Sequence, residues 1–272
     1  MLKDVRVALV ISTYNWPEAL HQVLVSVRNQ YILPDEVLIA DDGSDSRTKN
    51  LISSFKQEFP VPIRHFWHPD EGFRKAIIMN AAIASSSSDY IVQIDGDIIV
   101  HPNFIKDHIE EAEKGCYIKG SRVLLSSLKT SRILASKEKR VTIKPYSCGI
   151  TNRLNACRLP SLSKLFIKKH KRSHDLRGCN CAYWKKDFVA INGYNNELQG
   201  WGHEDIELAA RFINLGLLQK TVKLKAICYH LDHPYNPRLS EQANYLKYKE
   251  VVKEGNIRCK DGLEGAVLNL EV

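Results

Sequence analysis

The chain has no long hydrophobic run. None of its 272 residues belong to an uninterrupted apolar stretch of about 18 or more, the length that a membrane-spanning helix needs. The first residues lead directly into a strand-like segment and lack the apolar stretch and cleavage site of a secretory signal. We therefore expect a protein of the cytoplasm.

The cysteines form no regular framework. The chain has seven, and an odd number without a repeated spacing is typical of reduced thiols rather than of a disulfide scaffold. Cys179 and Cys181 form a C-x-C pair, which lacks the ligand spacing of a zinc site and favours buried thiols. This cysteine usage also indicates a cytoplasmic protein.

Signatures of nucleic-acid-binding modules are absent, although the formal net charge is +8. No RNP motif, helix-turn-helix pattern or zinc finger is found, so we expect no nucleic-acid partner. Part of the positive charge is concentrated in one cluster, made of Lys168, Lys169, His170, Lys171, Arg172, His174 and Arg177. Such a cluster can attract phosphates, nucleic acid or an anionic membrane surface, or it can be a solvated, flexible loop. We keep peripheral contact with the inner face of a membrane as a hypothesis.

Strand and helix signals alternate through the first hundred residues. Apolar runs predict strands at residues 5–11, 37–40, 63–67 and 90–94, and the segments between them predict helices at 15–29, 48–55 and 75–84. This alternation predicts an α/β fold with a mostly parallel central sheet flanked by helices. Ligands of such sheets bind beyond the carboxyl ends of the strands.

Beyond residue 115 the pattern is less regular. Residues 126–174 are polar, basic and weakly periodic, and we interpret them as a partly mobile insert that forms a lid or an acceptor platform. Further on, the patterns predict helices at 185–191 and 204–215 and a strand at 222–229. We expect one domain over residues 1–272, with halves at about 1–100 and 101–240 and a tail over 241–272.

Two carboxylates and a histidine are candidate metal ligands. Asp95-Gly96-Asp97 follows a predicted buried strand, and the glycine lets a ligand approach closely. Such a motif is by itself more often an ordinary turn, but carboxylate oxygens suit Mg²⁺ or Mn²⁺. His230 and His233 follow a later strand, where a neutral imidazole can complete the site, and we favour His230 as the ligand. We expect a divalent metal, Mn²⁺ or Mg²⁺, which would neutralise a leaving diphosphate.

Two further motifs follow predicted strands, at Thr13-Tyr14-Asn15 and at Asp41-Asp42-Gly43-Ser44. A carboxylate at such a position can accept a hydrogen bond from a base or a ribose, or it can cap the next helix. Arg74 or Lys75, at the start of a predicted helix, can meet a phosphate, or the pair can be plain surface charge. These residues are candidates for nucleotide binding.

The segment Gly200-Trp201-Gly202-His203-Glu204-Asp205 is unusual. Its glycines allow a tight loop to present the indole ring, which suits stacking on the face of a sugar. Glu204 and Asp205 start a predicted helix, where they can compensate the helix dipole or act as a general base.

In this order the motifs resemble a known family. Residues 7–15, 41–44 and 95–97 resemble family 2 glycosyltransferases. Residues 192–194 and 200–205 resemble the C-terminal motif shared by β-1,4-galactosyltransferases and bacterial chondroitin-type polymerases. Gly72-Phe73-Arg74 followed by Asn80 is similar to the same polymerases. The matching segments cover about residues 5–100 and 178–235, and the insert matches no motif of the family.

The resemblance implies a GT-A fold, a Rossmann-like nucleotide-binding half with an acceptor-binding half, and an inverting transfer from a UDP-sugar. Asp205 would be the base with Glu204 beside it, and Asp41 or Asp42 would hold the uracil. The implied donor contacts are Thr13, Tyr14, Asn15, Asp41, Asp42, Arg74, Asn80, Asp95 and Gly96. The implied metal ligands are Asp97, Asp95 and His230, and the implied contacts to the acceptor or sugar are Trp201, Gly202 and His203.

We therefore expect an enzyme that moves a hexosyl or N-acetylhexosaminyl group to a saccharide or lipid-linked acceptor, in the synthesis of bacterial surface polysaccharide or lipopolysaccharide. Two alternatives stay open. A sugar nucleotidyltransferase should show a glycine-rich phosphate loop after the first strand, where this chain has Ser12-Thr13-Tyr14-Asn15. A non-enzymatic module would use the basic cluster to bind a polyanion or a membrane.

Overall fold

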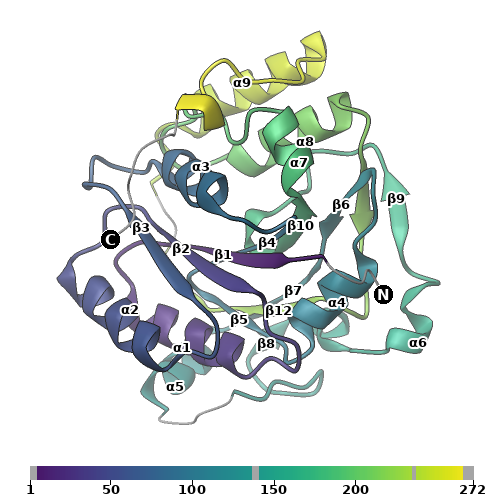
Figure 1. The fold of residues 1–272 in the computed structure, drawn as a ribbon. Helices are drawn as coiled ribbons and strands as arrows, with labels where there is room; N and C mark the ends of the chain where they lie inside the picture. The colour runs from purple at the N-terminus through teal and green to yellow at the C-terminus, as the bar shows by residue number, and fades with distance from the viewer. Residues whose placement is uncertain (1–4, 137–140, 235–236, 266–272) are drawn as a thin grey trace.

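A computed structural model describes residues 5–136, 141–234 and 237–265, and its centre is a mixed sheet (Figure 1). The strand order in this sheet is β3-β2-β1-β4-β10-β6-β11-β9. The first four of these strands are parallel to one another. The bounds are β1 (Val7–Thr13), β2 (Glu36–Asp41), β3 (Ile63–Trp67), β4 (Tyr90–Asp95), β6 (Cys116–Lys119), β9 (Lys168–His170), β10 (Cys181–Trp184) and β11 (Leu218–Thr221).

A smaller sheet begins where β4 ends. It contains β5 (Ile98–Val100), β12 (Ile227–His230), β7 (Ser121–Leu125) and β8 (Ile150–Thr151) in that order. A two-residue turn at Gly96 and Asp97 separates β4 from β5. The backbone N–H of Leu231 donates to the carbonyl of Asp97 at 3.0 Å, so the segment after β12 is fixed beside this turn. Asp97 therefore lies at the junction of the two sheets.

Helices cover both faces of the large sheet (Figure 1). One hydrophobic cluster joins the sheet to α1 and α2 through residues such as Leu9, Leu24 and Ile52, and a second joins it to α3, α7 and α8 through Ile78 and Phe212. All of β1 is buried, which explains its continuous apolar sequence. The helices are α1 (Pro17–Arg28), α2 (Ser46–Glu58), α3 (Lys75–Ser85), α4 (Phe104–Glu111), α5 (Ser127–Ala135), α6 (Pro160–Ser163), α7 (Lys185–Ala190), α8 (Glu204–Asn214) and α9 (Glu241–Glu254), with 3₁₀ turns η1 (Arg153–Ala156), η2 (Gly178–Asn180) and η3 (Leu263–Gly265).

This architecture confirms the predicted α/β class, and several element boundaries differ from expectation. The strand predicted at 222–229 begins too early, because residues 222–226 connect β11, which ends at Thr221, to β12, which begins at Ile227. Between them Leu224 and Ala226 have φ values of 63° and 49°, a left-handed conformation that apolar patterning does not reveal. The first helix begins at Pro17 rather than at Asn15, whose side-chain oxygen instead accepts the N–H of Asp45 at 2.8 Å.

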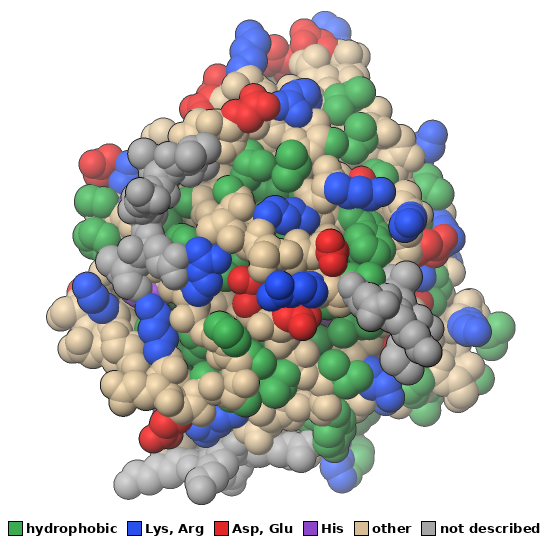
Figure 2. Space-filling model, viewed as in Figure 1, with side chains coloured by type: hydrophobic (Ala, Val, Ile, Leu, Met, Phe, Trp, Pro, Cys, Tyr) green, Lys and Arg blue, Asp and Glu red, His purple; other side chains and the backbone are tan. Residues whose placement is uncertain are grey.

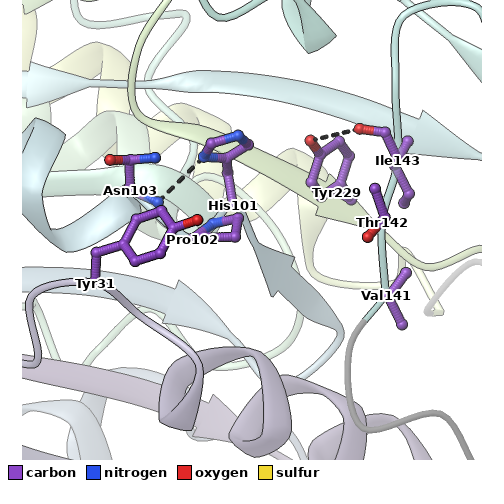
Figure 3. Close-up of a pocket in the computed structure, with 8 residues that line it drawn as sticks. All are labelled: Tyr31, His101, Pro102, Asn103, Val141, Thr142, Ile143 and Tyr229. Atoms are coloured by element: carbon purple, nitrogen blue, oxygen red, sulfur yellow. Dashed lines mark hydrogen bonds between the residues drawn. The ribbon is translucent and has the colours of Figure 1, made fainter.

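The described parts of the insert are more ordered than the sequence indicates. They contain α5, β8, η1, α6 and β9, and Ile133, Ile143 and Ile150 are buried in a cluster with Tyr229 of β12. The Tyr229 hydroxyl donates to the carbonyl of Ile143 at 3.2 Å, beside a pocket of about 260 Å³ lined by Tyr31, His101, Pro102, Asn103, Val141, Thr142, Ile143 and Tyr229 (Figure 3). Regular elements therefore run through these parts, the lid or acceptor-platform role stays a prediction, and residues 137–140 lie outside the described residues.

Candidate active site

Asp97, His230 and His233 form a compact group at the junction of the two sheets. Asp97 Oδ2 lies 3.5 Å from His230 Nε2 and 3.2 Å from His233 Nε2. One ligand atom from each residue falls within 4.8 Å of the others, and no second group of this kind occurs among the residues that the structure describes. Asp97 comes from the turn after β4, His230 ends β12, and His233 follows in the next loop.

The electrostatics of this group suit a divalent cation. Burial and the neighbouring Asp95 raise the pKa of Asp97 to about 7, and burial and Arg122 lower the pKa of His230 to about 4. Asp97 Oδ1 is buried without a hydrogen-bond partner. A neutral imidazole keeps its lone pair for a metal, and a set of one carboxylate and two imidazoles fits a first-row divalent ion such as Mn²⁺. The residues present therefore fit the expected metal.

Asp95, a predicted ligand, lies outside this group. Its Oδ1 accepts hydrogen bonds from Ser12 Oγ and from Lys75 Nζ, each at 2.8 Å. Burial acts to raise the pKa of Asp95, but Lys75 and Ser12 outweigh it and hold that pKa below its usual value. The structure thus groups His233, rather than Asp95, with Asp97 and His230.

Lys75 connects the end of β4 to the start of α8. Its Nζ is 2.8 Å from Asp95 Oδ1 and 4.0 Å from Glu204 Oε1. Burial alone would lower the pKa of Lys75, but Asp95, Asp205 and Glu204 raise it well above its usual value. The single buried ammonium group of Lys75 therefore interacts with three carboxyl groups. Acidic and basic side chains also gather near the middle of the face seen in Figure 2.

Asp205 is held by groups from three other segments. Its Oδ2 accepts the backbone N–H of Gly178 at 2.7 Å, and its Oδ1 lies 3.5 Å from the Tyr194 hydroxyl. Tyr194 and Tyr183 both donate to Gln93 Oε1 at 2.9 Å, and Gln93 Nε2 donates to the carbonyl of Gly178 at 3.2 Å. A side chain at position 178 would lie 2.3 Å from Asp205 Oδ1, so this position requires glycine. The Asp205 carboxylate is therefore fixed in place.

Sequence reasoning missed most of this support. Gln93, Gly178 and Tyr183 carry no motif of their own, and Tyr194 was noticed as part of residues 192–194 without a role. A buried polar residue inside an otherwise apolar strand, such as Gln93 in β4, was the available signal, because a buried amide needs hydrogen-bond partners.

The two neighbouring aspartates at the end of β2 have different surroundings. Asp41 has no exposed surface, and its carboxylate accepts the N–H of Ser44 at 2.9 Å and lies 2.9 Å from His65 Nε2. Asp42 accepts the backbone N–H of Arg74 at 3.0 Å and lies 2.7 Å from His68 Nε2. Asp42 is thus the one of the pair that lies beside Arg74.

The remaining donor candidates are divided between the surface and the interior. The Tyr14 side chain is 51% exposed, and its hydroxyl donates to Asp70 at 2.7 Å. Arg74 Nη2 donates to the carbonyl of Pro69 at 2.6 Å, and Arg74 Nε is buried without a partner. Thr13 lies against Gly96, where an added side chain would come within 2.9 Å of Thr13 Oγ1.

Asn80 is buried in the interior. Its side chain has no exposed area, and its amide donates to the carbonyl of Tyr194 at 2.8 Å and to Asn196 Oδ1 at 2.9 Å. Its oxygen accepts the N–H of Tyr194 at 2.8 Å. The structure therefore uses Asn80 to fix the turn at residues 192–196, rather than as the donor contact that the sequence predicts.

The loop before α8 is braced by α9 and the segment that precedes it. The Arg238 guanidinium lies 5.3 Å from the centre of the Trp201 ring, and the His203 ring lies 5.1 Å from that of Tyr245. The carbonyl of Gly202 accepts a hydrogen bond from Asn244 at 3.0 Å. These contacts hold Trp201, Gly202 and His203, the residues that directly precede the carboxylates of α8.

Glu204 gives the fold a testable pH dependence. Burial and Asp205 raise the pKa of Glu204 from its ordinary 4.5 to about 7 in the folded protein. Between these values the folded state holds a proton that the unfolded state has released, so the free energy of unfolding falls as the pH rises through this window. We expect Glu204→Gln to remove about 1–3 kcal/mol of this fall. Urea unfolding at about pH 5 and about pH 8 measures it.

The matched control for this measurement is Glu250→Gln, which changes an exposed glutamate of α9. This control should keep the pH dependence of the wild type. An equal fall in stability for Glu204→Gln and the wild type would show that Glu204 titrates normally in the folded protein.

Comparison with known proteins shows the family of the chain. Residues 8–186 match the description "Glycosyl transferase family 2", and residues 161–234 match "N-terminal domain of galactosyltransferase". The first match covers more than half of the chain, which therefore belongs to glycosyl transferase family 2. This confirms the resemblance found in the motifs and identifies the chain as a glycosyltransferase.

Similar proteins include the chondroitin synthase of Escherichia coli, with 24% identity over 87% of this chain and 36% of the relative. The hyaluronan synthase of Pasteurella multocida has 23% identity over 85% of this chain and 25% of the relative. The chain thus spans about a quarter to about a third of the length of these two relatives.

Solved structures show the same fold at low identity. A structure of GalNAc-T7 with UDP, GalNAc and Mn²⁺ aligns with a TM-score of 0.65 and 15% identity, over 92% of this chain and 48% of that one. S. aureus TarS 1-349 aligns with a TM-score of 0.58 and 13% identity, over 96% of this chain and 68% of that one. These likenesses, together with the large mixed sheet, confirm the predicted GT-A fold.

Proposed function

We propose that the enzyme transfers a hexosyl or N-acetylhexosaminyl group from a UDP-sugar to a hydroxyl of a saccharide or lipid-linked saccharide, with inversion and with a divalent metal. One observation carries this proposal. Beyond the carboxyl end of β4, Asp97, His230 and His233 form a trio suited to a metal, and Lys75 links the neighbouring Asp95 to the carboxylates of α8. The GalNAc-T7 structure with UDP, GalNAc and Mn²⁺ supports a UDP-sugar donor.

On the donor side, Asp97, His230 and His233 would hold Mn²⁺ or Mg²⁺. When bound, the metal would neutralise the diphosphate that leaves the sugar. Asp42 is the better candidate for the uracil, because Asp41 has no exposed surface, whereas Asp42 keeps a small exposed fraction and lies beside Arg74.

The other donor contacts follow from their positions around the end of β1 and the start of α3. The polar groups assigned to the nucleotide are Thr13, Tyr14, Asn15, Asp42, Arg74, Asp95 and the backbone of Gly96. To turn its guanidinium toward a phosphate, Arg74 would leave the Glu71 carboxylate, 2.6 Å away, and the carbonyl of Pro69. Glu71 is mostly exposed, so the loss of this ion pair costs little.

On the acceptor side, Asp205 takes the proton of the attacking hydroxyl. A bond forms between the acceptor oxygen and the anomeric carbon while the bond from that carbon to the phosphate oxygen breaks. Glu204 hydrogen-bonds the acceptor, and Trp201 offers a flat ring to a sugar face. Lys75 has a positioning role between the donor-side and acceptor-side carboxylates.

In this proposal residues 1–100 form the nucleotide-sugar half, and residues 101–240 form the acceptor half with the insert at 126–174. The natural role would be the synthesis of bacterial surface polysaccharide or lipopolysaccharide. The polysaccharide synthases among the similar proteins agree with this role.

A panel of UDP-sugars with Mn²⁺ and saccharide acceptors, scored by release of UDP, tests the proposal. We expect one or two UDP-sugars to be used and GDP-mannose, the control donor, to be refused. UDP should also protect the enzyme against heat, because a ligand stabilises by RT ln(1 + [L]/Kd). Release of pyrophosphate from UTP and a sugar phosphate, without UDP release, would instead indicate a nucleotidyltransferase.

A further inference from the structure

A short helical turn at the edge of the molecule exposes large apolar side chains. α6 continues through one more turn, in which the N–H of Phe166 donates to the carbonyl of Ser163 at 2.9 Å. Ser163 is fully buried and anchors the turn. The outward side chains are Leu159, Leu162, Leu165 and Phe166, which are 48%, 45%, 77% and 51% exposed. Several large apolar groups together on the surface indicate an interaction site.

Basic side chains surround this turn. Lys164, Lys168, Lys171 and Arg172 are exposed, and the sequence has no aspartate or glutamate between Val141 and His174. Lys169 lies against Glu113. Hydrophobic and basic side chains meet at the lower right edge of Figure 2, where Figure 1 places α6. We call residues 159–172 the basic-apolar surface.

The basic-apolar surface is joined to the acceptor side of the site. β9 pairs antiparallel with β11, with Lys168 opposite Thr221 at the carboxyl end of β11. From β9 the chain continues to Gly178, whose N–H holds Asp205. Asp175, on the way, pairs with Lys119 at the end of β6. The surface is therefore fixed to the frame that carries the proposed base.

We propose that the basic-apolar surface docks the enzyme on an anionic lipid bilayer. Leu165 and Phe166 enter the boundary between headgroups and acyl chains, and the surrounding Lys and Arg side chains contact lipid phosphates. Apolar groups inside a basic rim match a bilayer, which offers negative charge at its surface and hydrocarbon beneath it. No helix among the described residues is long and apolar enough to cross a bilayer.

Co-sedimentation with lipid vesicles tests this proposal without any glycosyl transfer. One set of vesicles contains phosphatidylcholine alone, and the other also contains phosphatidylglycerol. We expect the wild type to bind the anionic vesicles at low salt and the neutral ones far less. The triple variant Lys168→Ser, Lys171→Ser, Arg172→Ser should lower the partition constant on the order of a hundredfold at low salt, and less as salt rises.

A second variant separates apolar insertion from charge. Leu165→Ser with Phe166→Ser should lower the partition constant about tenfold, and this loss should persist at high salt because apolar burial is not screened. Control variants change exposed residues of α9 and of the segment after it: Lys249→Ser, Lys253→Ser, Lys260→Ser for charge, and Leu246→Ser, Val252→Ser for exposed apolar area. Both controls should bind as the wild type does.

Several results would overturn the proposal. These are no binding of the wild type to anionic vesicles at low salt, equal binding to neutral vesicles, or an equal loss in the matched controls. Self-association in lipid-free sedimentation that Leu165→Ser with Phe166→Ser abolishes would assign the surface to a second copy of the chain instead. Circular dichroism and thermal unfolding confirm that each variant is folded. Since no activity is measured, failure here leaves the proposed transfer reaction separately testable.

Discussion

Replacing Asp97 with alanine is expected to lower the rate of sugar transfer by about a thousandfold or more. Asp97 is the acidic member of the group with His230 and His233, and its Oδ2 lies beside both imidazoles while its Oδ1 is buried without a hydrogen-bond partner. Without it, two neutral imidazoles have to hold the cation that stabilises a leaving diphosphate. Such stabilisation is worth several kcal/mol, and each 1.36 kcal/mol is about tenfold in rate.

The measurement compares UDP release by Asp97→Ala and by Asp232→Ala. Asp232 is an exposed aspartate next to His233 in sequence, so this control changes the charge equally while leaving the trio intact. The wild type should also lose activity in EDTA and regain it with Mn²⁺. Full transfer in EDTA would remove the metal from the mechanism. An Asp97→Ala variant as active as Asp232→Ala and the wild type would do the same.

Much of the first half of the fold could be predicted because its signals are local. The strand predicted at 63–67 is β3, and the helix predicted at 75–84 differs from α3 by one residue. Strands buried on both faces read as continuous apolar runs, and their ends mark where ligands bind. For this reason Asp95, Asp97 and Thr13 were assigned to the same edge of the sheet, and β4 and β1 do end side by side, with Ser12 opposite Asp95.

The parts of the site that could not be predicted from the sequence depend on contacts between distant segments. His233 reaches Asp97 because β12 pairs with β5 and the Leu231 N–H bonds to the Asp97 carbonyl, neither of which has a sequence signature. Likewise, the contact between Gly178 and Asp205 depends on the positions of β9 and β10, the strands on either side of Gly178 in the sequence. A motif identifies the residue type, but the pairing of strands decides which residue completes the set.

Replacing Asp205 with asparagine is expected to lower the rate of transfer by about 10²–10⁴-fold while UDP binding is retained. The substitution keeps the shape of the side chain, and its amide oxygen can still accept the N–H of Gly178. What it removes is the ability to take a proton from the acceptor hydroxyl. Burial raises the pKa of the Asp205 carboxyl, which makes the carboxylate a stronger base than an exposed aspartate.

Glu204 provides the comparison, because it is the adjacent carboxylate on the same helix and lies 4.0 Å from Lys75. Successive residues of a helix point about 100° apart, so the two side chains cannot occupy the same position toward an acceptor. If Asp205 is the base, Glu204→Gln should keep more activity than Asp205→Asn, and its main effect should be on KM for the acceptor. Measuring kcat, the acceptor KM and the Kd for UDP with Mn²⁺ for both variants tests this. A near-normal kcat for Asp205→Asn would exclude it as the base, and a loss of UDP binding together with activity would show that its carboxylate supports the Gly178 segment instead.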